Sequence, residues 1–287
     1  MPCLEMKTII AYLALFVLGV HGSSSVFLEE NCGVVPRLSY KIINGTPARL
    51  GRYPWMAFLH TPTYFLCAGS LINQWFVLTS AHCIEDDVEL IARLGENNRD
   101  NDIDCENNRC LEATQEYNVD MLFKHRLYDP KDFSNDIGML RLERRVEYTY
   151  HIQPICIFHH RRMQLVVDQI TWFKATGWGL TSTDLNTKSS RVLMELNLYR
   201  RPRNDCARIF KQNFLSGQIC AGNDDGNLCR GDSGGPQGRY VLIFGMKRFV
   251  QMGIASFTYE NCSKVSILTD VVRYGRWIKK VVDWYGR

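Results

Sequence analysis

From Ile42 onward the chain consists of short apolar runs separated by turn-forming residues, and this alternation limits it to a β-rich fold. The runs are rich in β-branched and aromatic residues, and Gly, Pro, Asn and Asp lie between them. Short strands bounded by turn residues are typical of an all-β sandwich or barrel. No repeat of 20–50 residues is evident. The runs are YPWMAFL, WFVLTS, ELIARLG, IGMLRL, VLMELNL, YVLIFGM and FVQMGIAS.

The segment VVRYGRWIKKVVDWY near the C-terminus departs from this pattern. Trp277, Val281 and Trp284 recur at i, i+4 and i+7, with Ile278 and Val282 beside them. This spacing places apolar side chains on one face of a helix. We therefore predict a C-terminal helix that lies on the β-rich body.

The N-terminus resembles a secretory signal peptide. The apolar run Thr8 to Val20 is too short to cross a bilayer, which needs about 20 residues, and small residues follow it. A buried core helix is the alternative. We predict cleavage near Gly22 and a secreted, extracellular protein. The chain then divides into a signal peptide (1–22), a short propeptide or light chain (23–41) and a main domain (42–287).

The cysteines agree with export to an oxidising compartment. Of the 11 cysteines, Cys3 would leave with the signal peptide, and the even number that remains favours a disulfide framework. Spacing alone does not give the pairing. No pair of CxxC motifs is present, which argues against a zinc site.

The charge pattern excludes some classes of partner. The net charge is only +4, and the basic residues are scattered, with short clusters but no long run. We therefore expect a solvated surface and neither a nucleic-acid nor a membrane partner. With 46% hydrophobic residues, the chain is too apolar for a disordered protein.

The stretch GNLCRGDSGGP offers Ser233 as a nucleophile. A hydroxyl is weakly nucleophilic until a base takes its proton, and the base needs an orienting acid. LTSAHC places His82 after one apolar run, and NDIGMLRL places Asp136 at the start of another. Each residue alone is more often structural. The order His, Asp, Ser in a secreted β-rich chain predicts nucleophilic catalysis.

Six motifs in order strengthen this prediction: IINGTPA, LTSAHC, NDIGML, ATGWG, GDSGGP and GIASF. From Ile42 to the C-terminus the chain resembles the chymotrypsin-like (trypsin-type) serine proteases. The resemblance implies an all-β fold of two six-stranded antiparallel β-barrels, with the active site in the cleft between them. It also implies a serine endopeptidase.

The resemblance assigns roles to residues of this chain. Ser233 becomes the nucleophile, His82 the general base and then acid, and Asp136 the group that orients the imidazole. The backbone N–H groups of Gly231 and Ser233 form the oxyanion hole. Ser256 supports the triad aspartate and borders the specificity pocket.

SYKIINGTPA resembles the activation site of the family. Cleavage after Lys41 would free the amino group of Ile42, which pairs with Asp232 in the family's pattern. A buried carboxylate without a partner is costly, so this ion pair would couple cleavage to ordering of the site. Asn44 begins a glycosylation sequon, but its closeness to the activation site argues against occupancy.

The specificity pocket departs from the trypsin pattern. Asn227 stands where trypsin-like members have Asp, and Thr258 and Ser266 match wall positions that are usually Gly. A basic P1 residue, the substrate residue before the cleaved bond, would lack a counter-charge. We predict a small or medium uncharged P1 residue. Lys41 would then need an upstream trypsin-like activating protease.

The resemblance also implies a disulfide pairing. It includes an extra bridge within 96–110 that is seen in arthropod clip-type proteases, although no clip domain is expected in this chain. The implied pairs are Cys32–Cys156, Cys67–Cys83, Cys105–Cys110, Cys206–Cys220 and Cys229–Cys262.

Some alternatives stay open. Asp224 or Asp225 could restore a basic preference, which would give a trypsin-like protease. A secreted regulatory or binding protein that keeps the fold is another alternative. Glu96 is a candidate ligand for a structural Ca²⁺, against a solvated loop, and no organic cofactor is expected. Expected partners are protein substrates, the activating protease and protein inhibitors, and the protein is expected to be a monomer.

Overall fold

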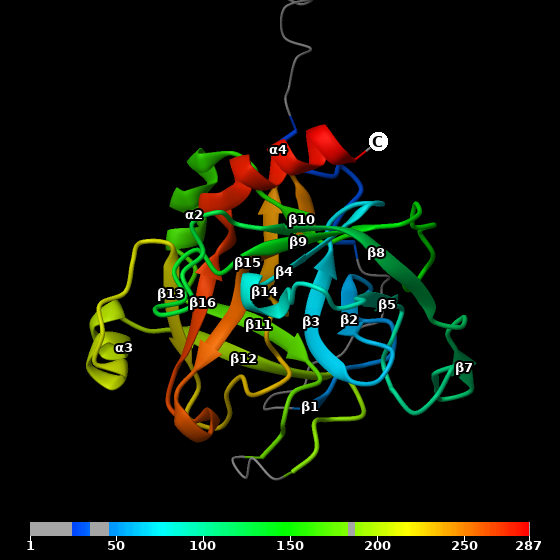
Figure 1. The fold of residues 1–287 in the computed structure, drawn as a ribbon, viewed down its shortest axis with the longest axis horizontal. Coiled ribbons are helices and arrows are strands. Elements are labelled where there is room, and N and C mark those ends of the chain that lie inside the picture. The colour runs from blue at the N-terminus through cyan, green and yellow to red at the C-terminus, as the bar shows by residue number, and fades with distance from the viewer. Residues whose placement is uncertain (1–24, 35–45, 183–186, 287) are drawn as a thin grey trace, which may run out of the picture.

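The computed structural model describes residues 25–34, 46–182 and 187–286. The predicted signal peptide, the bond after Lys41, Ile42 and Asn44 lie outside these ranges. Two closed antiparallel barrels stand side by side, the first blue to green and the second green to orange in Figure 1. The predicted fold class of two six-stranded barrels with a C-terminal helix is therefore confirmed.

The first barrel closes in the strand order β2-β3-β4-β9-β8-β5. The apolar runs WFVLTS and IGMLRL supply β4 and β9, whose side chains are almost all buried. In contrast, β8 is largely exposed and carries charged side chains. The strands are β2 (Met56–His60), β3 (Phe65–Leu71), β4 (Phe76–Thr79), β5 (Ile91–Leu94), β8 (Gln115–Lys124) and β9 (Gly138–Leu142).

The second barrel runs β12-β11-β14-β15-β16-β13 and closes because β13 also pairs with β12. Two short strands extend it, since β1 pairs with β12 and β10 lies parallel to β15. The strands are β1 (Thr46–Pro47), β10 (Cys156–Ile157), β11 (Trp172–Gly177), β12 (Met194–Arg200), β13 (Gln218–Gly222), β14 (Pro236–Ile243), β15 (Met246–Thr258) and β16 (Ser266–Asp270).

Short elements lie in the connections between the strands. Two of them form a hairpin in the polar loop expected at 96–110, and the small helices α2 and α3 were not predicted from the sequence. The elements are η1 (Ala81–Cys83), β6 (Cys105–Glu106), β7 (Arg109–Cys110), η2 (Arg161–Met163), α2 (Gln164–Asp168), α3 (Arg203–Phe210), η3 (Glu260–Cys262) and η4 (Val271–Tyr274).

The predicted C-terminal helix is α4 (Gly275–Tyr285), which lies across one end of the body (Figure 1). Its buried side chains are Ile278 and Val281, three residues apart. Trp284 is 66% exposed, so it does not belong to the buried face that the sequence pattern predicted. The exposed Trp284 ring instead makes a cation–π contact with Lys280, whose ammonium lies 4.3 Å from the ring centroid.

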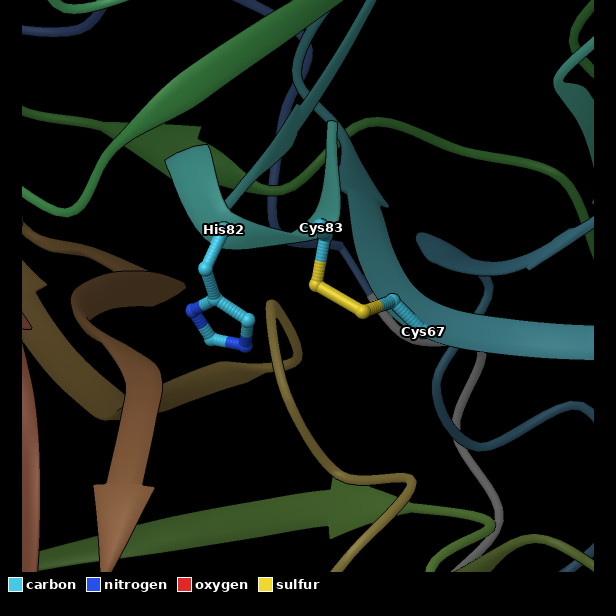
Figure 2. Close-up of side chains that lie close together, drawn as sticks. All are labelled: Cys67, His82 and Cys83. Atoms are coloured by element: carbon cyan, nitrogen blue, oxygen red, sulfur yellow. A yellow bond between two sulfur atoms is a disulfide. The ribbon is translucent and has the colours of Figure 1, made fainter. Parts of the chain in front are cut away.

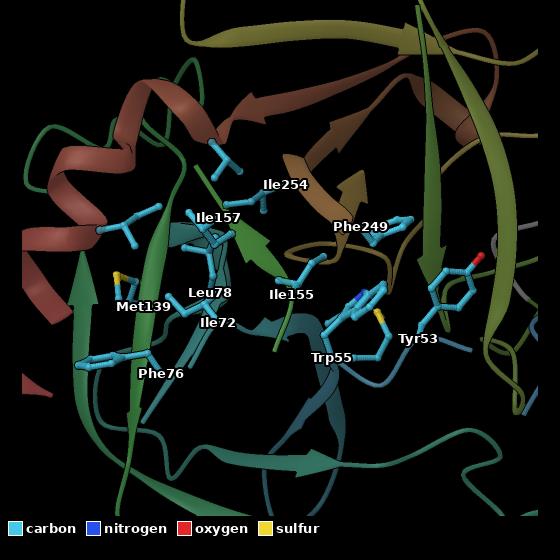
Figure 3. Packing of buried hydrophobic residues seen from close by; sticks show 14 of the residues in the cluster. Tyr53, Trp55, Ile72, Phe76, Leu78, Met139, Ile155, Ile157, Phe249 and Ile254 are labelled. Atoms are coloured by element: carbon cyan, nitrogen blue, oxygen red, sulfur yellow. The ribbon is translucent and has the colours of Figure 1, made fainter. Parts of the chain in front are cut away.

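The largest hydrophobic cluster joins the two barrels (Figure 3). It combines side chains of the first barrel, such as Phe76 and Leu78, with Phe249 and Ile254 of β15. Phe249 stacks on Trp55 with ring centroids 4.7 Å apart, and both side chains are buried. This cluster fixes how one barrel sits on the other.

The described part of the N-terminal segment is attached to the second barrel. Phe27 stacks on Phe158 at 5.3 Å, and the carbonyl of Gly33 accepts a hydrogen bond from the N–H of Phe249. Gly33 has φ +61°, and a Cβ there would lie 2.3 Å from the Phe249 carbonyl oxygen. The structure contains five disulfides, the pairs that the resemblance implies: Cys32–Cys156, Cys67–Cys83, Cys105–Cys110, Cys206–Cys220 and Cys229–Cys262.

Phe249→Ala should lower the free energy of unfolding by about 3–5 kcal/mol, because it leaves a cavity where the barrels meet. Urea denaturation with the disulfides intact measures the change. Leu242→Ala on the neighbouring strand is the control, because Leu242 is 72% exposed. It should change stability by less than about 0.5 kcal/mol. Equal effects of the two substitutions would contradict the assigned core.

Candidate active site

A histidine and an aspartate of the first barrel are joined by two hydrogen bonds. The Nδ1 atom of His82 lies 2.8 Å from Oδ2 of Asp136, and the backbone N–H of His82 donates to Oδ1 at 3.0 Å. An ionised carboxylate can only accept, so the proton of the ring contact belongs to Nδ1. The other ring nitrogen, Nε2, is then free to act as a base.

The second barrel holds this aspartate in place. Asp136 is fully buried, and Ser256 on β15 donates its hydroxyl to Oδ2 at 2.5 Å. Thr269 on β16 donates to the backbone carbonyl of Asp136 at 2.8 Å. Since three donors reach the carboxylate, its negative charge is stabilised despite burial. Ser256 thus contacts Asp136, as the resemblance implies.

Phe133, which was not predicted from the sequence, packs against the histidine. Its ring meets the His82 ring edge-on at 5.7 Å, and on its other side it contacts Phe257 at 4.9 Å. The residue lies three positions before Asp136 in DFSND, and its only signal was an aromatic side chain in a polar turn. The contact restricts how the imidazole can tilt.

Ser233 lies on a loop that is bonded to both barrels. Its carbonyl accepts from the N–H of Ala68 on β3 at 2.8 Å, and the N–H of Gly234 donates to Ala255 on β15 at 2.8 Å. Gly231 has φ +101°, a conformation that favours glycine. Within the described ranges, the N–H groups of Gly231 and Ser233 have no hydrogen-bond acceptor. Both donors are therefore available to a developing oxyanion.

His82 and Ser233 line the same pocket, whose volume is about 520 Å³. Ser256 and Thr258, two of the four residues expected at the specificity site, also line it. The lining residues that were not predicted include the polar or charged Arg230, Tyr259 and Glu260.

The other two expected specificity residues lie behind Thr258. The Ser266 hydroxyl donates to Oδ1 of Asn227 at 2.7 Å and lies 3.2 Å from the Thr258 hydroxyl. The N–H of Leu228 also donates to Oδ1 of Asn227, which identifies that atom as the oxygen. Asn227 lines a neighbouring cavity of about 260 Å³ instead of the pocket of Ser233. Ser266 is fully buried.

The two acidic residues considered for a basic preference lie away from the Ser233 pocket. Asp224 is exposed and forms an ion pair with Arg201 at 2.9 Å. Asp225 is exposed and lines the neighbouring cavity. Neither carboxylate lines the pocket that contains Ser233.

Asp232, beside the serine, is a buried carboxylate with no counter-charge among the described residues. Its Oδ1 accepts from the N–H of Gly179 at 2.8 Å, and its Oδ2 accepts from the N–H of Cys229 at 2.9 Å. Burial raises the pKa of Asp232 to about 6, although these two hydrogen bonds act in the opposite direction. A Cβ at Gly179 would lie 2.5 Å from the carboxyl carbon, so only glycine fits there. The carboxylate lines the cavity of about 260 Å³.

The trypsin family model matches residues 42–278, which is most of the chain. The chain belongs to the trypsin family. It is 32% identical over 271 residues to Serine protease grass of Drosophila melanogaster, covering 88% of this chain and 71% of that protein. It is 33% identical over 291 residues to Phenoloxidase-activating enzyme 1 of Spodoptera litura, covering 91% of this chain and 74% of that protein.

A solved structure agrees with this assignment. The crystal structure of the Drosophila Grass clip serine protease of the Toll pathway matches with a TM-score of 0.79 at 30% identity. The match covers 93% of this chain and 77% of that one. This member of the trypsin family is accordingly a serine protease, similar to arthropod clip-domain proteases. Among the described residues, no helix combines the length and the apolar character needed to cross a bilayer.

A cluster of metal-ligand types in this trypsin-family chain does not make a metal site. Cys67, His82 and Cys83 lie close together, as Figure 2 shows. The two sulfur atoms are bonded to each other, so neither is a thiolate that could bind a metal. The disulfide instead braces the turn that carries His82.

Glu96, the candidate calcium ligand, already has a cation beside it. One carboxylate oxygen accepts from the Arg93 guanidinium at 3.1 Å, and burial raises the pKa of Glu96. The nearby carboxylate of Asp104 accepts from backbone N–H groups. No group of three His, Cys or acidic side chains gathers around Glu96 in the described ranges. The other carboxylate oxygen, Oε1 of Glu96, is buried without a hydrogen-bond partner among the described residues, so calcium binding here stays a prediction.

The raised pKa of Asp232 predicts that the uncleaved chain loses stability as pH rises. Its folded-state pKa of about 6 exceeds the ordinary value of 3.8, so between these values the folded state binds more protons than the unfolded state. The free energy of unfolding should therefore fall by about 3 kcal/mol in total between about pH 3 and pH 7, most steeply between pH 4 and pH 6, and level off above. Urea denaturation across this range measures it. Asp232→Asn should lack this part of the pH dependence, and identical pH profiles would contradict the assignment.

Proposed function

We propose that this chain is a secreted serine endopeptidase that is made as a zymogen and activated by cleavage after Lys41. One observation carries the proposal: His82, which is hydrogen-bonded to the buried Asp136, lines the same pocket as Ser233. Acyl transfer also requires stabilisation of a negatively charged oxygen. The N–H groups of Gly231 and Ser233, which have no acceptor among the described residues, can supply it.

The residues support a two-step hydrolysis. His82 Nε2 takes the proton of the Ser233 hydroxyl while the oxygen bonds to the substrate carbonyl carbon. Asp136 stabilises the resulting imidazolium, and the oxyanion accepts from the N–H groups of Gly231 and Ser233. His82 then gives its proton to the leaving amine, which leaves an acyl-enzyme. Water, activated by His82, attacks the acyl group and regenerates the serine.

Asp232 supports the zymogen part of the proposal. Its carboxylate is buried, and among the described residues it has two backbone donors but no cation. Cleavage after Lys41 would give Ile42 an ammonium group that can enter the cavity beside Asp232. The ion pair would fix the turn Cys229–Asp232, which also carries Gly231. Cleavage and a working oxyanion hole would thereby be coupled.

The pocket supports a small uncharged P1 residue. The Thr258 and Ser266 hydroxyls lie 3.2 Å apart, and the Ser266 hydroxyl donates a hydrogen bond to the side-chain oxygen of Asn227. The amide of Asn227 is therefore shielded from a P1 side chain that enters beside Ser233. At the position where trypsin-like members carry Asp, a Lys or Arg at P1 would meet the hydroxyl groups of Thr258 and Ser266 instead of a carboxylate, which leaves a partly buried charge without its usual partner.

This specificity implies a position within a proteolytic cascade. An enzyme that rejects basic P1 residues cannot cleave after its own Lys41, so an upstream trypsin-like protease would activate it. Protein substrates and protein inhibitors in the extracellular space fit the same picture. Phenoloxidase-activating enzyme 1, a similar protein, is by its name an enzyme that activates phenoloxidase.

A P1 profile of the protein cleaved after Lys41 tests the proposed function. In a peptide library, cleavage should follow small uncharged residues such as Ala, Ser, Thr and Val. Ser233→Ala should abolish it, and the uncleaved protein should be at least about 100-fold slower. Strong cleavage after Lys or Arg would overturn the pocket assignment. Absence of cleavage and of Ser233 labelling by a fluorophosphonate would favour a binding protein.

The same profile can be repeated with Thr258→Gly combined with Ser266→Gly. Removing both side chains should deepen the pocket and raise cleavage after Leu or Gln by about 10-fold or more. Ser216→Gly, an exposed position outside the pocket, is the control. An unchanged P1 profile of the double variant would show that the Thr258 and Ser266 side chains do not limit the depth of the pocket.

A further inference from the structure

A second groove, of about 630 Å³, adjoins the pocket of Ser233. Tyr259 lines both. Two of the cations in this groove are already paired with carboxylates that also line it. Arg201 pairs with Asp224, and Arg208 pairs with Asp205. These pairs are exposed and balance their own charges.

Two lysines of the groove have no carboxylate partner in the described part of the chain. Lys211 and Lys264 are both exposed, and neither takes part in an ion pair there. The ammonium of Lys264 lies 4.8 Å from the centroid of the Tyr259 ring. This contact places a positive charge next to the residue that the groove and the active-site pocket share.

Both lysines occupy a backbone conformation that is unfavourable for their residue type. Lys211 follows α3 with φ +55°, and Lys264 has φ +65°. Glycine or asparagine is the usual residue at such positions, because a Cβ is crowded in the left-handed region. One groove thus holds two lysines in strained positions, and neither has a carboxylate partner among the residues that the structure describes. This combination indicates that their positive charges bind a ligand.

The end of β15 leads from the catalytic serine to this groove. Pairing between β14 and β15 stops at Ile254, whereas β16 pairs with β15 as far as Thr258. One edge of the segment 256–258 is thus free to receive an extended substrate backbone. A substrate whose P1 residue lies beside Ser233 would continue along this edge, past Tyr259, toward Lys264.

We propose that Lys211 and Lys264 bind carboxylates of an acidic substrate segment that precedes P1. This inference rests on the proposed function, since it assigns a substrate class to the same active site. Glu260 lines the pocket close to the serine and would repel a carboxylate there. The acidic residues therefore lie several positions upstream of P1, beyond Glu260.

Binding of two matched peptides to the cleaved Ser233→Ala protein tests this without relying on catalysis. Both peptides carry Ala at P1 and a fluorescent label. One has Asp and Glu at the third to sixth positions before the bond, and the other has Asn and Gln. Fluorescence anisotropy should show about 5-fold tighter binding of the acidic peptide at low salt, as expected for two exposed ion pairs. The preference should disappear at about 0.5 M salt.

The variant Lys211→Ala/Lys264→Ala should bind both peptides equally. Lys247→Ala, at an exposed lysine outside the groove, should keep the preference. Equal binding of the two peptides by the unsubstituted groove, or a preference that survives in the double variant, would overturn the proposal. If the acidic peptide is preferred but no peptide is hydrolysed by the cleaved Ser233 protein, the groove stands and the proposed function fails.

Thermal unfolding separates a binding role from a structural one. Lys211→Gly and Lys264→Gly relieve the strained backbone, so each should raise Tm by about 2 °C while the acidic preference is lost. A fall in Tm in both variants would show that the lysines are kept for stability, which would contradict the proposal.

Discussion

The buried Asp232 carboxylate is the constraint on which the rest of the site depends. Burial raises its pKa to about 6, and two backbone N–H groups are its only donors in the described structure. The turn that carries it also presents the N–H groups of Gly231 and Ser233. Any group that neutralises the carboxylate therefore acts on the oxyanion hole as well. A terminal ammonium would neutralise the Asp232 carboxylate at neutral pH, whereas protonation of Asp232 would neutralise it only in acid.

The reacting groups come from both barrels, so the packing between barrels determines their geometry. His82 and Asp136 belong to the first barrel, while Ser256 of the second barrel donates to Asp136. The serine loop is bonded to β3 on one side and to β15 on the other. The stacked pair Trp55 and Phe249 lies in the cluster that joins the barrels. Core packing at a distance from the serine thus supports the catalytic geometry.

The sequence predicted the barrels and the grouping of His82, Asp136 and Ser233, because strand periodicity and the motifs are local patterns. It failed where tertiary contacts decide. The exposed strand β8 carries charges that hide its alternation, and the run YVLIFGM contains a turn at Phe244. The periodic pattern placed Trp284 in the buried face of the C-terminal helix, yet it is exposed. Motif position likewise could not show that hydroxyl contacts shield Asn227 from the pocket of Ser233.

The most direct test moves the new N-terminus by one residue. A glycine inserted between Lys41 and Ile42 leaves the cleavage site and the triad unchanged but alters where the ammonium falls relative to Asp232. After complete cleavage, the rate at which a fluorophosphonate labels Ser233 should be about 100-fold lower than in the cleaved native chain. Equal labelling rates would show that the ammonium does not act through Asp232, which would contradict activation by this ion pair.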